Sequence, residues 1–478
     1  MKERLLKLTR KILNNMPTLE FGKIDFNNGQ ANTDASASSG LSPYLKGCNL
    51  RYRKGVLAPQ ASKENVTATT SLASKTAVVV GDGTSSGGIG YMLLSEDSTK
   101  DGHIFSVEVT EGVIGAQSTE DTGRDYDIDK IDCIHDADDL YTSSNTDISK
   151  GGGNLGAVDW DWGSTTGGMT IQNGSVHHFF QFQKYLYITN GTNIYRSASG
   201  GGTPFTEKII FNWNDAVTCA IPHNGKIYIC IMNDSELAYG KKTKMQRMAI
   251  WDGDSALPDS ETNLPARCYS MFSYNGKLLL FFEKFIGYYN GLNIDAIWDL
   301  NGTSPVYKGK IKQIDDVLYF IDGADIMAFD GSKFWCYYTG SANIDTIWNL
   351  IGDNLDFIEG DNAYKFDLFD IDGTGKASSL PIEFPQKVAI QKIKLFLDED
   401  MVSGDSNTIK IYDEGDTLVY TGTATFANDG AIRFKEFGQN GGNLCRLDTM
   451  RIVLDTFSNL VKRVLIKYAP IDEVSTPK

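Results

Sequence analysis

The sequence predicts an all-β protein: a β-propeller of about six blades, followed by a C-terminal β-sandwich and preceded by an extended N-terminal arm. Asn-Gly pairs separate strand-like segments, these hairpins recur every roughly 40 to 50 residues, and helical periodicity is almost absent after residue 15. The 478 residues, with 48 glycines and only 12 prolines, suit many tight turns between short strands. We expect residues 1–60 to form the arm, 61–383 the propeller and 384–478 the sandwich.

Residues 1–60 are predicted to begin with a short basic helix and to continue as an extended arm. Leu5, Leu8 and Ile12 fall on one helical face, and residues 27–41 are small and polar. The basic residues are not followed by an apolar segment of the kind found in secretory signals. No apolar stretch approaches the ~18 residues that span a bilayer, so we expect no membrane-spanning segment.

Eight Asn-Gly pairs mark candidate hairpin turns. This pair favours two-residue turns because both turn residues need positive φ. With Asn224 and Gly225 as the turn, Cys219 is predicted to lie directly opposite Cys230. A disulfide between them is geometrically possible, but seven scattered cysteines without a Cys-x-x-Cys motif favour reduced, buried thiols in a cytoplasmic compartment.

A tryptophan recurs in the hairpin region. Residues 293–298 (NIDAIW) match residues 343–348 (NIDTIW) at an offset of 50, and Trp251 lies 47 residues before Trp298. We therefore predict Trp251, Trp298 and Trp348 as repeated core positions. A unit of about 40 to 50 residues with four short strands is typical of a propeller blade. Six blades are expected, five and seven remain open, and 353–382 is a partial seventh blade or a ring-closing piece.

The last segment, 384–471, breaks this pattern. It contains at least five alternating strands without the recurring tryptophan, which predicts a separate β-sandwich.

No catalytic, cofactor-binding or metal site is predicted. His177 and His178 are adjacent on a strand and point to opposite faces, so we expect one to be buried and one exposed rather than both to bind one metal. His135 lies in an acidic segment that is typical of a solvated turn. The acidic segment 367–373 lacks the distant glutamate of a calcium loop. We therefore expect a protein that is not an enzyme and needs no cofactor.

Several segments resemble tailed-phage propeller proteins. The segment FGKIDFNNGQ and the stretch LSPYLKGCNLRYRKGVLAPQ are similar to their arm, and LYITNGTNIYR, KLLLFFEKFIGYYNG and DDVLYFIDGADIMAFDG to their blade hairpins. The end, RLDTMRIVLDTFSNLVKRVLIKYAP, is similar to their closing sandwich strands. The family is the tail nozzle, or packaged-DNA stabilisation, protein of short-tailed phages. The resemblance covers the pattern and order of most of the chain, and residues 119–170 depart from it.

This resemblance implies a structural virion protein of the phage tail, assembled in the host cytoplasm. In that family several copies, usually six, form a ring below the portal and adaptor. The ring continues the DNA channel, retains packaged DNA and holds tail fibres or a tail needle. The net charge of −16 is compatible with a lumen that repels DNA without sequence-specific binding, and equally with plain solubility.

Two other functions stay open. Trp160 and Trp162 alternate on one predicted strand face, where they could stack on a glycan or contact a partner, or instead lie in a blade core. The first alternative is therefore a receptor- or glycan-binding tail propeller. The second is a propeller-type polysaccharide hydrolase.

Overall fold

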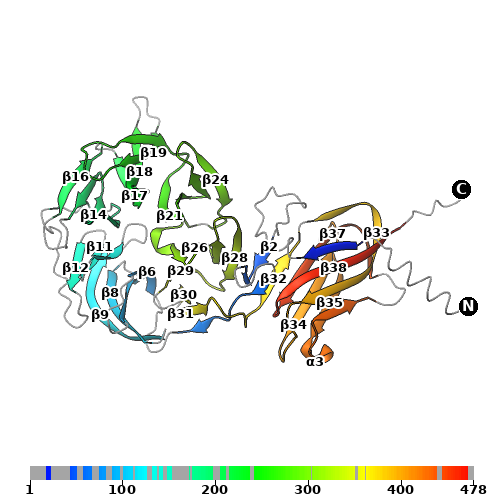
Figure 1. Cartoon of the computed structure of the whole chain (residues 1–478). Helices are drawn as coiled ribbons and strands as arrows, with labels where there is room; N and C mark the ends of the chain where they lie inside the picture. Colours follow the sequence, from blue (N-terminus) through cyan, green and yellow to red (C-terminus); the bar gives the residue numbers. More distant parts are fainter. Residues whose placement is uncertain are drawn as a thin grey trace, which may run out of the picture. The chain divides into compact units, whose positions relative to one another are not determined.

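A computed structural model provides the backbone of most of the chain. The described residues are 18–22, 44–50, 57–66, 75–81, 89–96, 101–110, 113–125, 132–136, 139–143, 148–152, 169, 172, 175–197, 205–211, 215–236, 242–302, 304–349, 354–360, 362–379, 381–438 and 444–471. Figure 1 shows a cartoon of the chain, coloured from blue at the N-terminus to red at the C-terminus. Among them, no helix is long and apolar enough to cross a bilayer.

Seven antiparallel sheets build the propeller within the described residues (Figure 1). The first sheet contains β6 (Lys75–Gly81), β7 (Ile89–Glu96), β8 (Asp101–Thr110) and β9 (Val113–Asp125). The second contains β10 (Cys133–Asp136), β11 (Asp139–Ser143) and β12 (Ile148–Gly152). The third contains β13 (Phe179–Phe182), β14 (Tyr185–Asn190), β15 (Asn193–Arg196) and β16 (Thr206–Ile210). The fourth and fifth contain β17 (Asp215–His223), β18 (Lys226–Glu236), β19 (Lys242–Trp251) and β20 (Ser260–Asn263); and β21 (Cys268–Tyr274), β22 (Lys277–Phe282), β23 (Phe285–Tyr289) and β24 (Ile294–Asp299).

The last two sheets follow a short 3-10 helix, η3 (Lys308–Lys310). They contain β25 (Ile311–Ile314), β26 (Val317–Asp322), β27 (Asp325–Phe329) and β28 (Phe334–Thr339); and β29 (Ile344–Trp348), β30 (Asn354–Glu359), β31 (Asn362–Asp367) and β5 (Glu64–Asn65). The seventh sheet thus takes its outer strand from the N-terminal part of the chain. Asn65 is paired with Tyr364 and Glu64 with Lys365.

The first strand of each sheet faces the centre of the ring. β10 lies beside both β6 and β13, β17 lies between β13 and β21, and β29 lies beside β6, which closes the circle. The second strands β14, β22, β26 and β30 are buried along almost their whole length. This explains their nearly continuous apolar sequences, KLLLFF in β22 and VLYFID in β26.

The structure confirms the all-β propeller and sandwich. It contains seven blades among the described residues, one of the counts that the sequence left open, rather than six. The difference arises at residues 344–348, which were expected to end the sixth blade. They instead form β29, the first strand of a seventh sheet.

The second unit is a sandwich whose longest strands are β33 (Ile382–Leu397), β37 (Cys445–Phe457) and β38 (Val461–Pro470). Its other members are β1 (Thr18–Gly22), β2 (Tyr44–Lys46), β32 (Gly375–Ser378), β34 (Ser406–Tyr412), β35 (Leu418–Thr425) and β36 (Phe434–Phe437), with the one-turn helix α3 (Phe426–Asp429). The main path runs β1-β38-β33-β37-β32-β2, and β34, β35 and β36 branch from it. Alternating residues of β34, such as Ile409 and Ile411, are buried in its core.

Both ends of the chain therefore contribute to the sandwich. By compactness, the sandwich unit comprises 1–62, 332–339 and 367–478, and the propeller unit comprises 63–331 and 340–366. The segment 332–339 contains β28, whose backbone pairing places it in the sixth sheet of the propeller. The sequence prediction had placed the propeller at 61–383. A two-stranded ribbon, β3 (Cys48–Asn49) and β4 (Ala58–Pro59), completes the described part of the arm. The predicted N-terminal helix lies outside the described residues.

Candidate functional site

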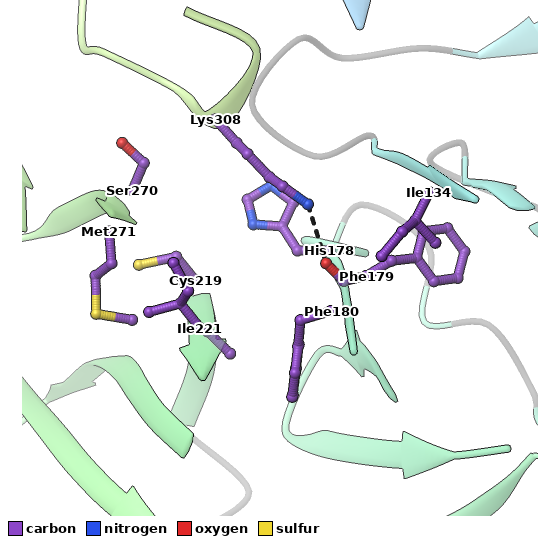
Figure 2. A pocket seen from close by; sticks show the side chains of 10 residues that line it. Ile134, His178, Phe179, Phe180, Cys219, Ile221, Ser270, Met271 and Lys308 are labelled. Atoms are coloured by element: carbon purple, nitrogen blue, oxygen red, sulfur yellow. Dashed lines mark hydrogen bonds between the residues drawn. The ribbon is translucent and has the colours of Figure 1, made fainter. Parts of the chain in front are cut away.

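A small cavity lies beside the first strands of the second to fifth sheets. Its volume is about 120 Å³. Figure 2 shows the side chains that surround it: Ile134, His178, Phe179, Phe180, Cys219, Ala220, Ile221, Ser270, Met271 and Lys308. The lining is mostly apolar, with an imidazole, a thiol, a hydroxyl and an ammonium group as its polar members.

Lys308, on η3, is held at the cavity by groups from two other sheets. Its ammonium group forms an ion pair with Asp132 and donates a hydrogen bond to the carbonyl oxygen of Phe179 at 3.0 Å (Figure 2). The buried Asp132 carboxylate also accepts a hydrogen bond from the Phe179 N–H at 2.8 Å. Because this carboxylate is paired and hydrogen-bonded, its burial is compensated.

The two adjacent histidines have different surroundings. The His177 Nε2 lies 3.1 Å from Asn190 Oδ1, whereas the His178 ring lines the cavity. Both rings are buried, so the prediction that one would be exposed is wrong. The reason is that neighbouring sheets cover both faces of this segment. Burial lowers the pKa of His178 to about 3, and the positive charge of Lys308 acts in the same direction. His178 is therefore neutral at physiological pH.

Three cysteines meet next to this cavity. Cys219 and Cys230 lie directly opposite each other on β17 and β18, as the Asn-Gly turn predicted. Cys268 comes from β21 of the next sheet, and its sulfur is 3.8 Å from that of Cys219. All three Sγ atoms lie within 4.8 Å of one another, and the thiols are free and buried. Met271 adds a fourth sulfur, 3.5 Å from Cys230 Sγ.

The three thiols are not equivalent. Burial raises the pKa of the Cys230 and Cys268 thiols well above the usual value. Burial acts in the same direction on Cys219, but its side-chain contacts with Cys230 and Cys268 lower its pKa well below the usual value. Such a group of sulfurs can bind a soft metal ion or form a disulfide.

Sequence reasoning found two members of this cluster and missed the third. The hairpin register follows from local turn chemistry, so the pairing of Cys219 with Cys230 was predictable. Cys268 joins them only through the packing of the fourth sheet against the fifth. The spacing of 49 residues between Cys219 and Cys268, close to one blade length, is the signal that could have indicated it.

The recurring tryptophans are buried, but they do not occupy one repeated position. Trp251 ends β19, the third strand of its sheet, Trp298 lies in the outer strand β24, and Trp348 ends the inner strand β29. The prediction that all three lie in the core is confirmed, but the positions are not equivalent, because the three tryptophans lie in different strands of different sheets. The other predicted pair, Trp160 and Trp162, lies outside the described residues.

Carboxylates of the acidic segment after β31 accept hydrogen bonds from backbone N–H groups. Asp367 accepts a hydrogen bond from the N–H of Phe369, and Asp372 accepts one from the N–H of Ser62. The side chains of His135 and of its acidic neighbours are not among the described parts of the chain.

No protein-family model and no curated protein matches this chain. Among solved structures, it is similar to the Pan2 WD40 domain of Neurospora crassa, at 10% sequence identity and a TM-score of 0.40, over 62% of this chain and 90% of that chain. It is also similar to BBS1N, solved in complex with ARL6DN, at 9% identity and a TM-score of 0.41, over 64% of this chain and 95% of that chain. The propeller assignment rests on the sheets of the chain itself.

Proposed function

We propose that this chain is a structural virion protein of a phage tail. Six copies form a ring, the nozzle or hub, that extends the DNA channel below the portal and adaptor. The ring retains packaged DNA and anchors tail fibres or a needle. The protein is assembled in the host cytoplasm and has no enzymatic role in this proposal.

The observation that carries the proposal is the path of the N-terminal arm. Strands β1 and β2 of the arm belong to the sandwich, and β5 belongs to the seventh sheet of the propeller. In the order of the chain, the propeller thus lies between segments of the sandwich, which contains residues from both the N-terminal and the C-terminal parts of the sequence. This order of arm, propeller and sandwich is the one that the resemblance to tail nozzle proteins implies.

Closure by β5 suits a protein under mechanical load. Opening the circle of blades within one propeller at the seventh sheet requires breaking the pairing of β5 with β31. It also requires breaking the hydrogen bond from the Val66 N–H to the Ala363 carbonyl at 3.0 Å. Lys63, just before β5, also forms an ion pair with the buried Glu359 at 2.7 Å. These contacts hold the first residues of the propeller against its last sheet.

The charge of the chain supports passage of DNA rather than its binding. With 61 acidic and 45 basic residues the net charge is −16, so the average surface repels phosphates. The cavity of about 120 Å³ inside one propeller is far too small for DNA. The channel in this proposal therefore lies between copies. A ring of identical copies needs head-to-tail contacts.

The native mass of the purified full chain, measured over a range of concentrations, tests this proposal. A species of six times the chain mass of 52.6 kDa supports it. A stable trimer contradicts it and favours a receptor-binding tail protein. If the chain is monomeric throughout, the measurement is repeated with the portal–adaptor complex, and a failure to bind that complex contradicts the proposal.

A further inference from the structure

The cysteine cluster joins two blades and has no part in the proposed tail function. Cys219 and Cys230 belong to the fourth sheet, whereas Cys268 and Met271 belong to the fifth. Four sulfur atoms thus gather in an otherwise apolar cluster of residues, which includes Leu280. Sulfur ligands of this kind, shielded from water and free of disulfides, are typical of a site for a soft metal ion.

We propose that Cys219, Cys230 and Cys268 bind one thiophilic d10 metal ion, Zn²⁺ or Cu⁺, which cross-links the fourth and fifth blades. At a Zn–S distance of about 2.3 Å, tetrahedral ligands lie about 3.8 Å apart. The sulfurs of Cys219 and Cys268 are separated by 3.8 Å, and no pair of the three exceeds 4.8 Å. The separations of the three sulfurs are therefore close to those of a tetrahedral ligand set.

Two neighbouring side chains can supply a fourth ligand. The thioether of Met271 lies 3.5 Å from Cys230 Sγ, and thioether ligands suit Cu⁺. The imidazole of His178 lines the same cavity as Cys219 (Figure 2), and a neutral imidazole suits Zn²⁺. Its ring does not lie within 4.8 Å of all three sulfurs, so it must move towards them to bind the ion. His178 is 3% exposed, and among the described residues no side chain forms a hydrogen bond with its ring.

Binding forms three metal–sulfur bonds, and each thiol that is protonated before binding releases its proton to the solvent. No electron is transferred. The three thiolates with Zn²⁺ carry one net negative charge, and with Cu⁺ they carry two. Burial therefore favours Zn²⁺, whereas the thioether favours Cu⁺, and the experiment must separate the two ions.

The test uses the reduced, metal-free full chain without oxygen. Co²⁺ is titrated first, because Co²⁺ bound to thiolates absorbs strongly in the near ultraviolet, and Zn²⁺ is then used to displace it. Cu⁺ is titrated separately against a colorimetric Cu⁺ chelator. We expect saturation at one ion per chain. Cys268→Ser should weaken binding at least about 100-fold, whereas Cys445→Ser, in the sandwich, should leave it unchanged.

Two further variants identify the ion. A loss in His178→Gln that is confined to Zn²⁺ assigns the site to Zn²⁺, and a loss in Met271→Leu confined to Cu⁺ assigns it to Cu⁺. X-ray absorption of the loaded wild-type chain needs no variant, and three sulfur neighbours at about 2.3 Å would support the site. Absence of stoichiometric binding of both ions, or fewer than three sulfur neighbours, would overturn it and leave the cluster as reduced core thiols.

Discussion

Asn65 on β5 is paired with Tyr364 on β31, so the N-terminal side of the propeller supplies the last strand of its seventh sheet. The contact is reinforced at Glu359, a buried carboxylate on β30. It forms an ion pair with Lys63 and accepts hydrogen bonds from the Ser341 hydroxyl at 2.9 Å and the Ala342 N–H at 3.2 Å. Residues from three separate segments are thus held at one carboxylate.

Removal of the Glu359 carboxylate should weaken the contact between the segment around β5 and the seventh sheet of the propeller. Glu359→Ala leaves Lys63 and the donors of Ser341 and Ala342 without their shared acceptor. We expect the free energy of unfolding of the propeller to fall by about 3 kcal/mol, measured by urea denaturation. The exposed Glu283, changed to Ala, is the control and should alter it by less than about 0.5 kcal/mol. Equal effects of the two variants would show that Glu359 does not hold the closure.

The turn between β17 and β18 requires positive φ angles at both of its central residues. Asn224 and Gly225 have φ angles of 46° and 74°, and a Cβ added at Gly225 would meet no atom within 4 Å. Gly225→Ala should therefore destabilise the propeller by about 1 kcal/mol through backbone strain, without any steric clash. Gly415→Ala, at a turn glycine with ordinary φ, is the matched control. An unchanged urea midpoint in Gly225→Ala would refute the strain argument.

Trp251 is expected to be one of the most sensitive core positions. It is fully buried, packs edge-on against Tyr187 of the third sheet at 6.0 Å between ring centroids, and donates a hydrogen bond to the Ser255 carbonyl at 2.7 Å. Trp251→Ala should lower the free energy of unfolding by about 4 kcal/mol. Trp251→Phe, which keeps an aromatic ring, should cost less. Leu292→Ala, at an 81% exposed residue, should have almost no effect, and a similar loss there would contradict the argument.

The sandwich should lose stability in acid partly through Asp455. Burial alone would raise the pKa of this carboxyl, but hydrogen bonds and charges from Lys376 and Lys410 lower it. Lys376 lies 2.6 Å from the carboxylate. Because the folded pKa lies below the unfolded value of about 3.9, the stabilisation is complete above that pH and is lost as the pH falls towards the folded pKa.

Asp455→Asn should therefore reduce the loss of sandwich stability between about pH 5 and pH 3. The measurement is the urea midpoint of the sandwich at each pH. Asp448→Asn, on the same strand with an exposed carboxyl, is the control. If Asp455→Asn and the wild type lose stability in parallel, the lysine contacts do not contribute to acid sensitivity.

The parts of the fold that depend on local turn chemistry could be predicted from the sequence. The pairing of His223 with Lys226 follows from the Asn-Gly turn, and it fixes the position of Cys219 opposite Cys230. At Asn290 the same signal does not produce a two-residue hairpin, because β23 ends before it and β24 begins only at Ile294. Tertiary packing decides between such outcomes.

Long-range pairing could not be predicted in the same way. β5 is two residues long and exposed, and it has no apolar pattern, yet it completes the seventh sheet. Cys268 reaches the cluster only through contact between sheets. The repeated NID-x-IW sequence misled the blade count because one copy became an outer strand and the other an inner strand. In each case the partner, rather than the segment itself, determines the role.

Images of negatively stained full-length protein test directly whether six copies of the chain form a ring. We predict ring-shaped particles with six-fold symmetry and an open centre, formed by the chain at high concentration or on the portal–adaptor complex. Particles with three-fold symmetry, or compact particles without a central opening under both conditions, would contradict a tail ring built from this propeller and sandwich.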